Sequence, residues 1–139
     1  MIIRKYDDYF LIKIFKENLD NFNIFDIDSI KVLFKDIINK LKEKYDLCGL
    51  IDTDVYVNNE YGLIIEMRSV CDYFDEIDIK IKLHLNKEFL VIIDNNSILD
   101  YDNVYYYNGK FYGTYLELCD NEVFYKDTDK IIHNGIKIY

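Results

Sequence analysis

Only one stretch of this sequence has the apolar spacing of an amphipathic helix, and that limits the folds open to the chain. Between about residues 28 and 44, apolar side chains recur every three or four positions, and Asp26 or Asp28 stands where an N-cap is expected. The apolar stripe consists of Ile30, Leu33, Phe34, Ile37, Ile38 and Leu41. The opposite side is lysine-rich, which is typical of a solvated helix face.

The rest of the chain has patterns typical of strands and tight turns. The segment EIDIKIKLHL, residues 76–85, alternates apolar and polar side chains, and Asn86-Lys87 predicts a turn into a following strand, EFLVIID. Two strands at 2–6 and 9–16 around an Asp7-Asp8 turn, or one bulged strand, are expected, as are strands at 49–57 and 62–68. Weaker strands are expected near 115–119, 122–126 and 130–138, with a turn at Asn134-Gly135.

These patterns predict a single α+β domain over residues 1–139. No linker rich in Pro, Gly or Ser interrupts the chain, and no repeat is present. We expect a mostly antiparallel β-sheet built from hairpins, with the helix at about 28–44 packed on one face. The element order over residues 1–68 (strand, strand, loop, helix, hairpin) resembles the N-terminal domain of MecA-type proteolytic adaptors, and this resemblance assigns no functional residue.

The net charge of −9 restricts the partners that the chain can bind. Such a chain is repelled by phosphate backbones, so we expect neither direct nucleic-acid binding nor binding to an anionic membrane. The charge is uneven: residues 46–78 have a net charge of −8 and residues 95–125 one of −4, whereas the three remaining segments are each +1. A concentrated acidic field favours a basic protein partner.

The cysteines and the N-terminus indicate a cytoplasmic location. Cys48, Cys71 and Cys119 are widely spaced and form no CxxC pair, which is typical of reduced thiols. The N-terminal residues lack the apolar core of a signal peptide, and no apolar run is long enough to cross a bilayer. Neither a metal-ligand spacing nor a phosphate-binding loop is present in the sequence, so we expect no cofactor.

The hairpin LIDTDVYV…YGLIIEMR carries the most unusual charge arrangement. A three-residue loop with Asn58 opposite Gly62 places Asp54 opposite Glu66 and Asp52 opposite Arg68. Like charges directly opposite each other are destabilising, so the first pair requires an explanation. A carboxylate-bound Mg²⁺ would provide one and would indicate a metal-dependent hydrolase or nuclease. The other explanation is an acidic face that binds a basic partner or has no function.

The segment VYYYNGKFYGTY, residues 104–115, predicts a second hairpin. Asn108-Gly109 favours a type I′ turn, which pairs residue 107 with 110 and residue 105 with 112. One face then carries Val104, Tyr106, Phe111 and Tyr115 and is the natural core face. The other face carries Tyr105, Tyr107, Lys110 and Tyr112 and is suited to protein contact. Structural packing and the stacking of a ligand or base are the alternatives for these rings. An AT-rich genome also produces many tyrosines, so their number alone does not indicate a binding function.

We therefore expect a non-catalytic protein-binding module of the inhibitor, immunity-type or adaptor kind that docks a basic partner, with nucleic-acid mimicry as one route. A metal-dependent hydrolase that uses Asp52, Asp54 and Glu66 is the alternative from a different class. Self-association, with the basic helix face against the acidic hairpin face, is the third. The expected partner-binding residues are Asp52, Asp54, Glu66, Tyr105, Tyr107, Lys110 and Tyr112.

Overall fold

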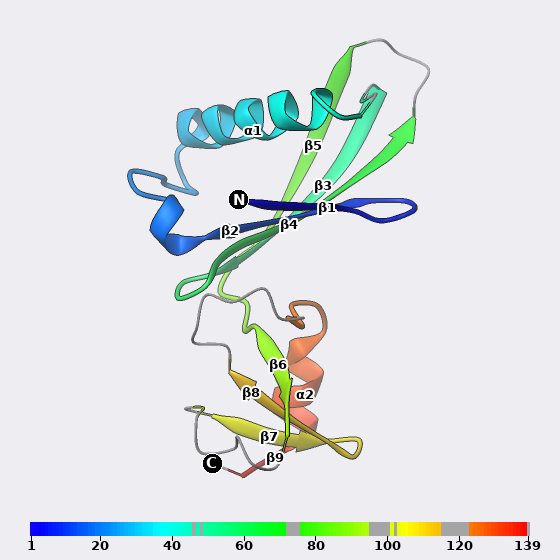
Figure 1. Ribbon diagram of the computed structural model, residues 1–139. Helices are drawn as coiled ribbons and strands as arrows, with labels where there is room; N and C mark the ends of the chain where they lie inside the picture. Colours follow the sequence, from blue (N-terminus) through cyan, green and yellow to red (C-terminus); the bar gives the residue numbers. More distant parts are fainter. Residues whose placement is uncertain are drawn as a thin grey trace.

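Two β-sheets, each accompanied by a helix, make up the described part of the chain (Figure 1). The computed structural model describes residues 1–45, 47, 49–71, 76–94, 101, 103–114 and 123–138. The larger sheet has the strand order β1 (Ile2–Lys5), β2 (Phe10–Phe15), β4 (Gly62–Cys71), β3 (Gly49–Asn58) and β5 (Ile77–His84). The smaller sheet has the order β6 (Leu90–Ile93), β8 (Lys110–Thr114), β7 (Val104–Tyr107) and β9 (Ile136–Lys137).

The α+β class and the main helix are confirmed. Helix α1 (Ile27–Lys42) lies across one face of the larger sheet (Figure 1), and its buried side chains Phe34, Ile37 and Leu41 come from the predicted stripe. Asp26 is the N-cap, because its carboxylate accepts a hydrogen bond of 3.1 Å from the backbone N–H of Asp28. A short 3₁₀ turn, Lys16–Asn18, begins the loop that leads from β2 to α1.

Strand β4 is buried on both faces. Leu63, Ile65 and Met67 belong to the hydrophobic cluster beneath α1. Ile64 points to the opposite face, where Val91 and Ile93 of the smaller sheet and Phe89, the residue before β6, complete a second cluster. The strand therefore joins two cores, and a polar side chain on its second face has to find its partners inside the protein.

The register of both predicted hairpins is confirmed. In β3–β4, Asn58 lies opposite Gly62, and the pairs continue as predicted through residues 54 and 66 to residues 52 and 68. In β7–β8, residues 107 and 110 and residues 105 and 112 are partners. Asn108 and Gly109 have φ values of 49° and 80°, as a type I′ turn requires.

The connection after residue 85 differs from the prediction. Asn86 has a φ of 55° and turns the chain, but β5 and β6 belong to different sheets. Strand β5 instead pairs with β3 in parallel, the one parallel pair among the described strands, because this position places Ile77 and Ile79 in the cluster beneath α1.

The strand predicted at 130–138 is wrong over most of its length. Residues Thr128–Asn134 form a helix, α2, and only Ile136–Lys137 form a strand. Thr128 and Ile131 are both buried, and their three-residue spacing matches a helix packed on one side. Phe124 forms a single bridge with Leu90 in place of the strand predicted at 122–126, and the strand predicted at 115–119 lies outside the described residues.

None of the helices in the described ranges is long and apolar enough to span a membrane.

Gly62 provides a test of the close approach between β4 and β2. Its φ is +123°, and an added Cβ would lie 2.2 Å from the carbonyl oxygen of Ile14 on β2. Gly62→Ala should therefore lower the free energy of unfolding by about 3 kcal/mol or more, since strained backbone and a backbone clash both contribute. Gly109→Ala is the matched control: its φ is +80° with nothing within 4 Å, and it should cost about 1 kcal/mol. Urea denaturation measures both, and equal losses would contradict the close approach.

Candidate functional site

The three carboxylates predicted to form one site lie in three different environments. Asp52 is exposed, Asp54 is half-buried, and the side chain of Glu66 is 1% exposed. Asp54 and Glu66 are directly opposite each other, on the face of the sheet away from α1. Asp52 lies opposite Arg68 on one side and Lys80 on the other.

Arginine, lysine and histidine side chains contact the Asp54–Glu66 pair. Arg68 lies between the two carboxylates, 3.9 Å from Asp54 Oδ2 and 3.4 Å from Glu66 Oε2. Lys126 Nζ is 2.6 Å from Glu66 Oε1, and His84 Nε2 is 2.9 Å from Asp54 Oδ1. These contacts offset the repulsion between Asp54 and Glu66. Among the described residues, no three His, Cys, Asp or Glu side chains are grouped so that they could hold a metal.

Two tyrosines complete this network. The Tyr125 hydroxyl donates a hydrogen bond of 2.7 Å to Glu66 Oε1, and Tyr56 stacks on His84 with ring centroids 4.4 Å apart. Burial, followed by the charges of Glu66 and Asp54, raises the pKa of Tyr56 to about 12. Burial and then the hydrogen bond to Glu66 raise the pKa of Tyr125 further. The network ties residues 123–126 to β4.

The tyrosine face of the second hairpin packs inside the protein. Tyr112 is 9% exposed and belongs to a cluster with Ile131 of α2, and Tyr105 and Tyr107 pack against the same cluster. Lys110 is exposed at the end of the hairpin. The predicted rings and the predicted carboxylates therefore lie on different sheets, and the structure does not bring them together.

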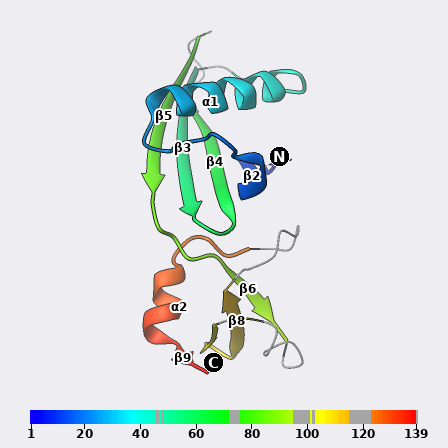
Figure 2. The same ribbon diagram turned by 90° about the vertical axis from the view of Figure 1, so that its left-hand side faces the viewer.

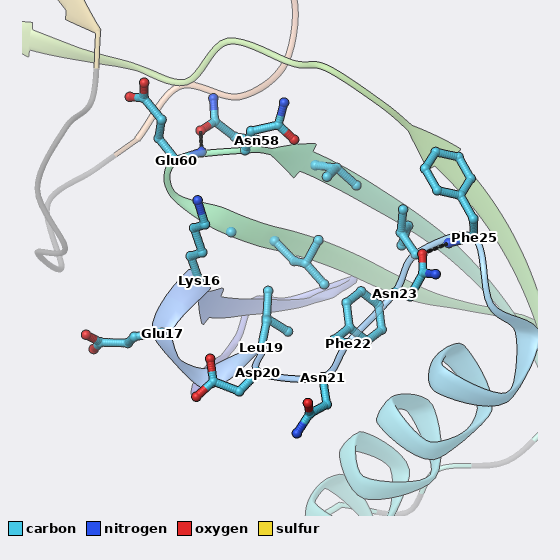
Figure 3. Close-up of a pocket in the computed structure, with 15 residues that line it drawn as sticks. Lys16, Glu17, Leu19, Asp20, Asn21, Phe22, Asn23, Phe25, Asn58 and Glu60 are labelled. Atoms are coloured by element: carbon cyan, nitrogen blue, oxygen red, sulfur yellow. Dashed lines mark hydrogen bonds between the residues drawn. The ribbon is translucent and has the colours of Figure 1, made fainter.

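Acidic side chains gather instead around the loop between β2 and α1. One groove, with a volume of about 830 Å³, lies between this loop and the tip of the β3–β4 hairpin. Figure 3 shows Leu19 and Phe22 pointing toward the hairpin, whereas Glu17 and Asp20 point away from it. Glu60, on the hairpin tip, also lines the groove.

A second groove, of about 630 Å³, lies on the other side of the loop, against α1. The two grooves share residues 19–22 as a common wall. Together they have six carboxylates and one ammonium group at their edges, and we call them the acidic groove surface. Its charged residues are Lys16, Glu17, Asp20, Asp26, Asp28, Asp36 and Glu60.

Two of these carboxylates also have local partners. Asp26 caps α1, and Asp36 lies 3.2 Å from Lys40 in an exposed ion pair. Exposed pairs of this kind are screened by solvent and contribute little to stability. The acidic groove surface keeps a net negative charge of four even when Lys40 is counted with it.

Large apolar side chains are strongly exposed beside these carboxylates. Phe25 lines the first groove with 79% of its surface exposed, and Val32 lines the second with 71% exposed. Ile27, in the first turn of α1, is 66% exposed. Apolar surface of this size within a charged rim is typical of an interaction site.

The opposite flank of α1 is basic. A third groove, about 770 Å³ in volume, lies between α1 and β5 and is lined by Lys31, Lys35 and Lys42 but by only one acid, Glu76. The helix therefore separates an acidic flank from a basic one. The net charge summed along the chain does not reveal the acidic flank, because the lysines of α1 cancel the charge of the nearby acids in that sum. The signal that could have revealed it is FDID, residues 25–28, in which the exposed Phe25 and Ile27 alternate with two aspartates.

Comparison of the chain with protein-family models, with curated proteins and with solved structures found no match. The residues and their geometry therefore carry the functional conclusion.

The raised pKa of Tyr56 predicts a loss of stability at alkaline pH. An unfolded tyrosine ionises near pH 10, whereas folded Tyr56 keeps its proton up to about pH 12. The stability that its neutral form contributes is therefore complete below pH 10 and is lost as the pH rises toward 12. Tyr56→Phe removes this group, so its free energy of unfolding should fall less steeply over that range than that of the parent protein. Urea denaturation at pH 8 to 11.5 measures this difference, and parallel curves would contradict the assignment.

Proposed function

We propose that the protein is a non-catalytic protein-binding module that docks a basic, amphipathic segment of a partner protein on the acidic groove surface. One observation carries the proposal: Phe25 and Val32 line these grooves and are largely exposed, within a rim of six carboxylates and a single lysine. An inhibitor, an immunity protein and an adaptor would all use this docking step.

The two kinds of side chain would have different parts in binding. Burial of Phe25 and Val32 would supply most of the affinity, because aromatic and aliphatic anchors dominate interface energies. The carboxylates would attract a basic partner and orient it, which raises the association rate and makes it sensitive to salt. Open grooves of about 830 and 630 Å³ on either side of the 19–22 wall offer room for apolar side chains of the partner.

The proposal keeps the predicted class of function but moves the site. Glu66 and Asp54 already contact Arg68, Lys126 and His84 inside the protein. Breaking those contacts to reach a partner would leave charged groups without compensation. The acidic groove surface requires no such rearrangement, since its apolar side chains are exposed before binding.

A synthetic amphipathic helix with leucines on one face and lysines on the other is a suitable probe. We expect its addition to shift the NMR amide signals of residues 19–36 and 57–63. Phe25→Ser should weaken binding about tenfold, since an anchor residue contributes more than 1 kcal/mol. Ile92→Ser is the matched control, because Ile92 is 46% exposed on β6 of the other sheet and its loss should leave the affinity unchanged.

Charge is tested with a second peptide in which glutamates replace the lysines. The lysine peptide should bind more tightly at low salt than at high salt, and the glutamate peptide should bind far more weakly. Equal binding of the two peptides would contradict the proposal. Signal shifts confined to another surface would contradict it as well.

A further inference from the structure

Strand β5 is an edge strand with an apolar face that is only partly covered. Figure 2 shows it at one side of the larger sheet, and in the described part of the chain it pairs with β3 alone. Ile81 and Leu83 are 38% and 37% exposed. An edge strand of eight residues is a ready template for pairing with another strand.

The backbone of β5 shows which residues face the free edge. The carbonyl of Glu76 accepts a hydrogen bond from the backbone N–H of Gly49, at the start of β3. In a strand, the N–H and C=O groups of one residue point to the same side, and those of the next residue point to the opposite side. The even-numbered residues therefore bond toward β3, while Ile77, Ile79 and Ile81 direct their backbone groups to the free edge.

The charges along β5 are complementary to those of a second β5 in one antiparallel register. With Ile79 opposite Ile79 of the other copy, Asp78 lies opposite Lys80 and Lys80 opposite Asp78. Asp78 and Lys80 are exposed on the face away from α1. This register also places Ile77 opposite Ile81, and the backbone groups of both residues point to the free edge. One step further, Glu76 meets Lys82, again with opposite charges.

We propose that two copies of this chain pair through β5, antiparallel and centred on Ile79, to form one continuous sheet. The twofold axis is perpendicular to the sheet, so both α1 helices lie on the same face. Asp78 and Lys80 form non-hydrogen-bonded pairs, in which opposite side chains come closest. A shift by two residues would place Lys80 opposite Lys80, so the charges select this register.

The partner is a second copy because the charge pattern complements itself. A strand with an unrelated sequence would need the same alternation of acid and lysine, whereas β5 supplies it to its own copy. The pairing also extends the apolar row of Ile77, Ile79 and Ile81 along the groove beside α1. This interface involves neither Phe25 nor the acidic groove surface, so it stands or falls independently of the proposed function.

Charge exchange between two variants tests the pairing. Asp78→Lys places lysine opposite lysine in its own dimer, and Lys80→Asp places aspartate opposite aspartate. Sedimentation equilibrium should show the parent protein as a dimer and each variant alone as a monomer. An equimolar mixture of the two variants should dimerise again, because both central pairs, residue 78 with residue 80 and residue 80 with residue 78, then combine opposite charges. Lys130→Asp, an exposed change on α2, is the control and should stay dimeric.

A monomeric parent protein would overturn the proposal, and so would variants that dimerise alone or a mixture that stays monomeric. Lys80 also lies opposite Asp52 on β3, so Lys80→Asp could weaken the fold. Ile81→Pro keeps the test valid in that case, since proline removes an N–H that points to the free edge and leaves the bonds to β3 intact. Its circular dichroism should match that of the parent while its dimer is lost, and a folded dimer would overturn the proposal.

Discussion

The burial of β4 on both faces is the constraint on which the rest of the structure depends. Side chains alternate along the strand, so Leu63, Ile65 and Met67 complete the core beneath α1, whereas Ile64 completes the core shared with the smaller sheet. Glu66 is carried into the second core by this alternation. Arg68 and Lys126 balance its charge, and the Tyr125 hydroxyl donates a hydrogen bond to it. The buried carboxylate therefore links residues 123–126 to the larger sheet.

The same packing determines where the surface charges lie. Because α1 buries one stripe against the sheet, its two flanks face different neighbours: the loop after β2 on one side and the edge strand β5 on the other. Acids gather on the first flank and lysines on the second, although residues 1–45 together have a net charge of only +1. Net charge along a chain is therefore a poor guide to the field that a partner meets, and the arrangement around the helix determines it.

The sequence predicted well whatever depends on local periodicity. The stripe of α1, the Asn108-Gly109 turn and the pairing of both hairpins follow from spacing and turn chemistry, and all agree with the structure. What it could not predict depends on contacts between distant segments. The α2 segment has short apolar spacing that fits a strand or a helix, and its packing against Tyr112 selects the helix. Likewise, nothing local to Glu66 indicates that Lys126, sixty residues later, balances its charge.

Helix α1 separates an acidic, apolar surface from a basic one. Solvent paramagnetic relaxation tests this separation directly, because a cationic nitroxide accumulates near negative surface and an anionic one near positive surface. The cationic probe should relax the amide protons of residues 19–28 more strongly than the anionic probe does, and the order should reverse around Lys31 and Lys35. Equal relaxation by the two probes at residues 19–28, or the opposite order there, would contradict the separation of acidic and basic surfaces by α1.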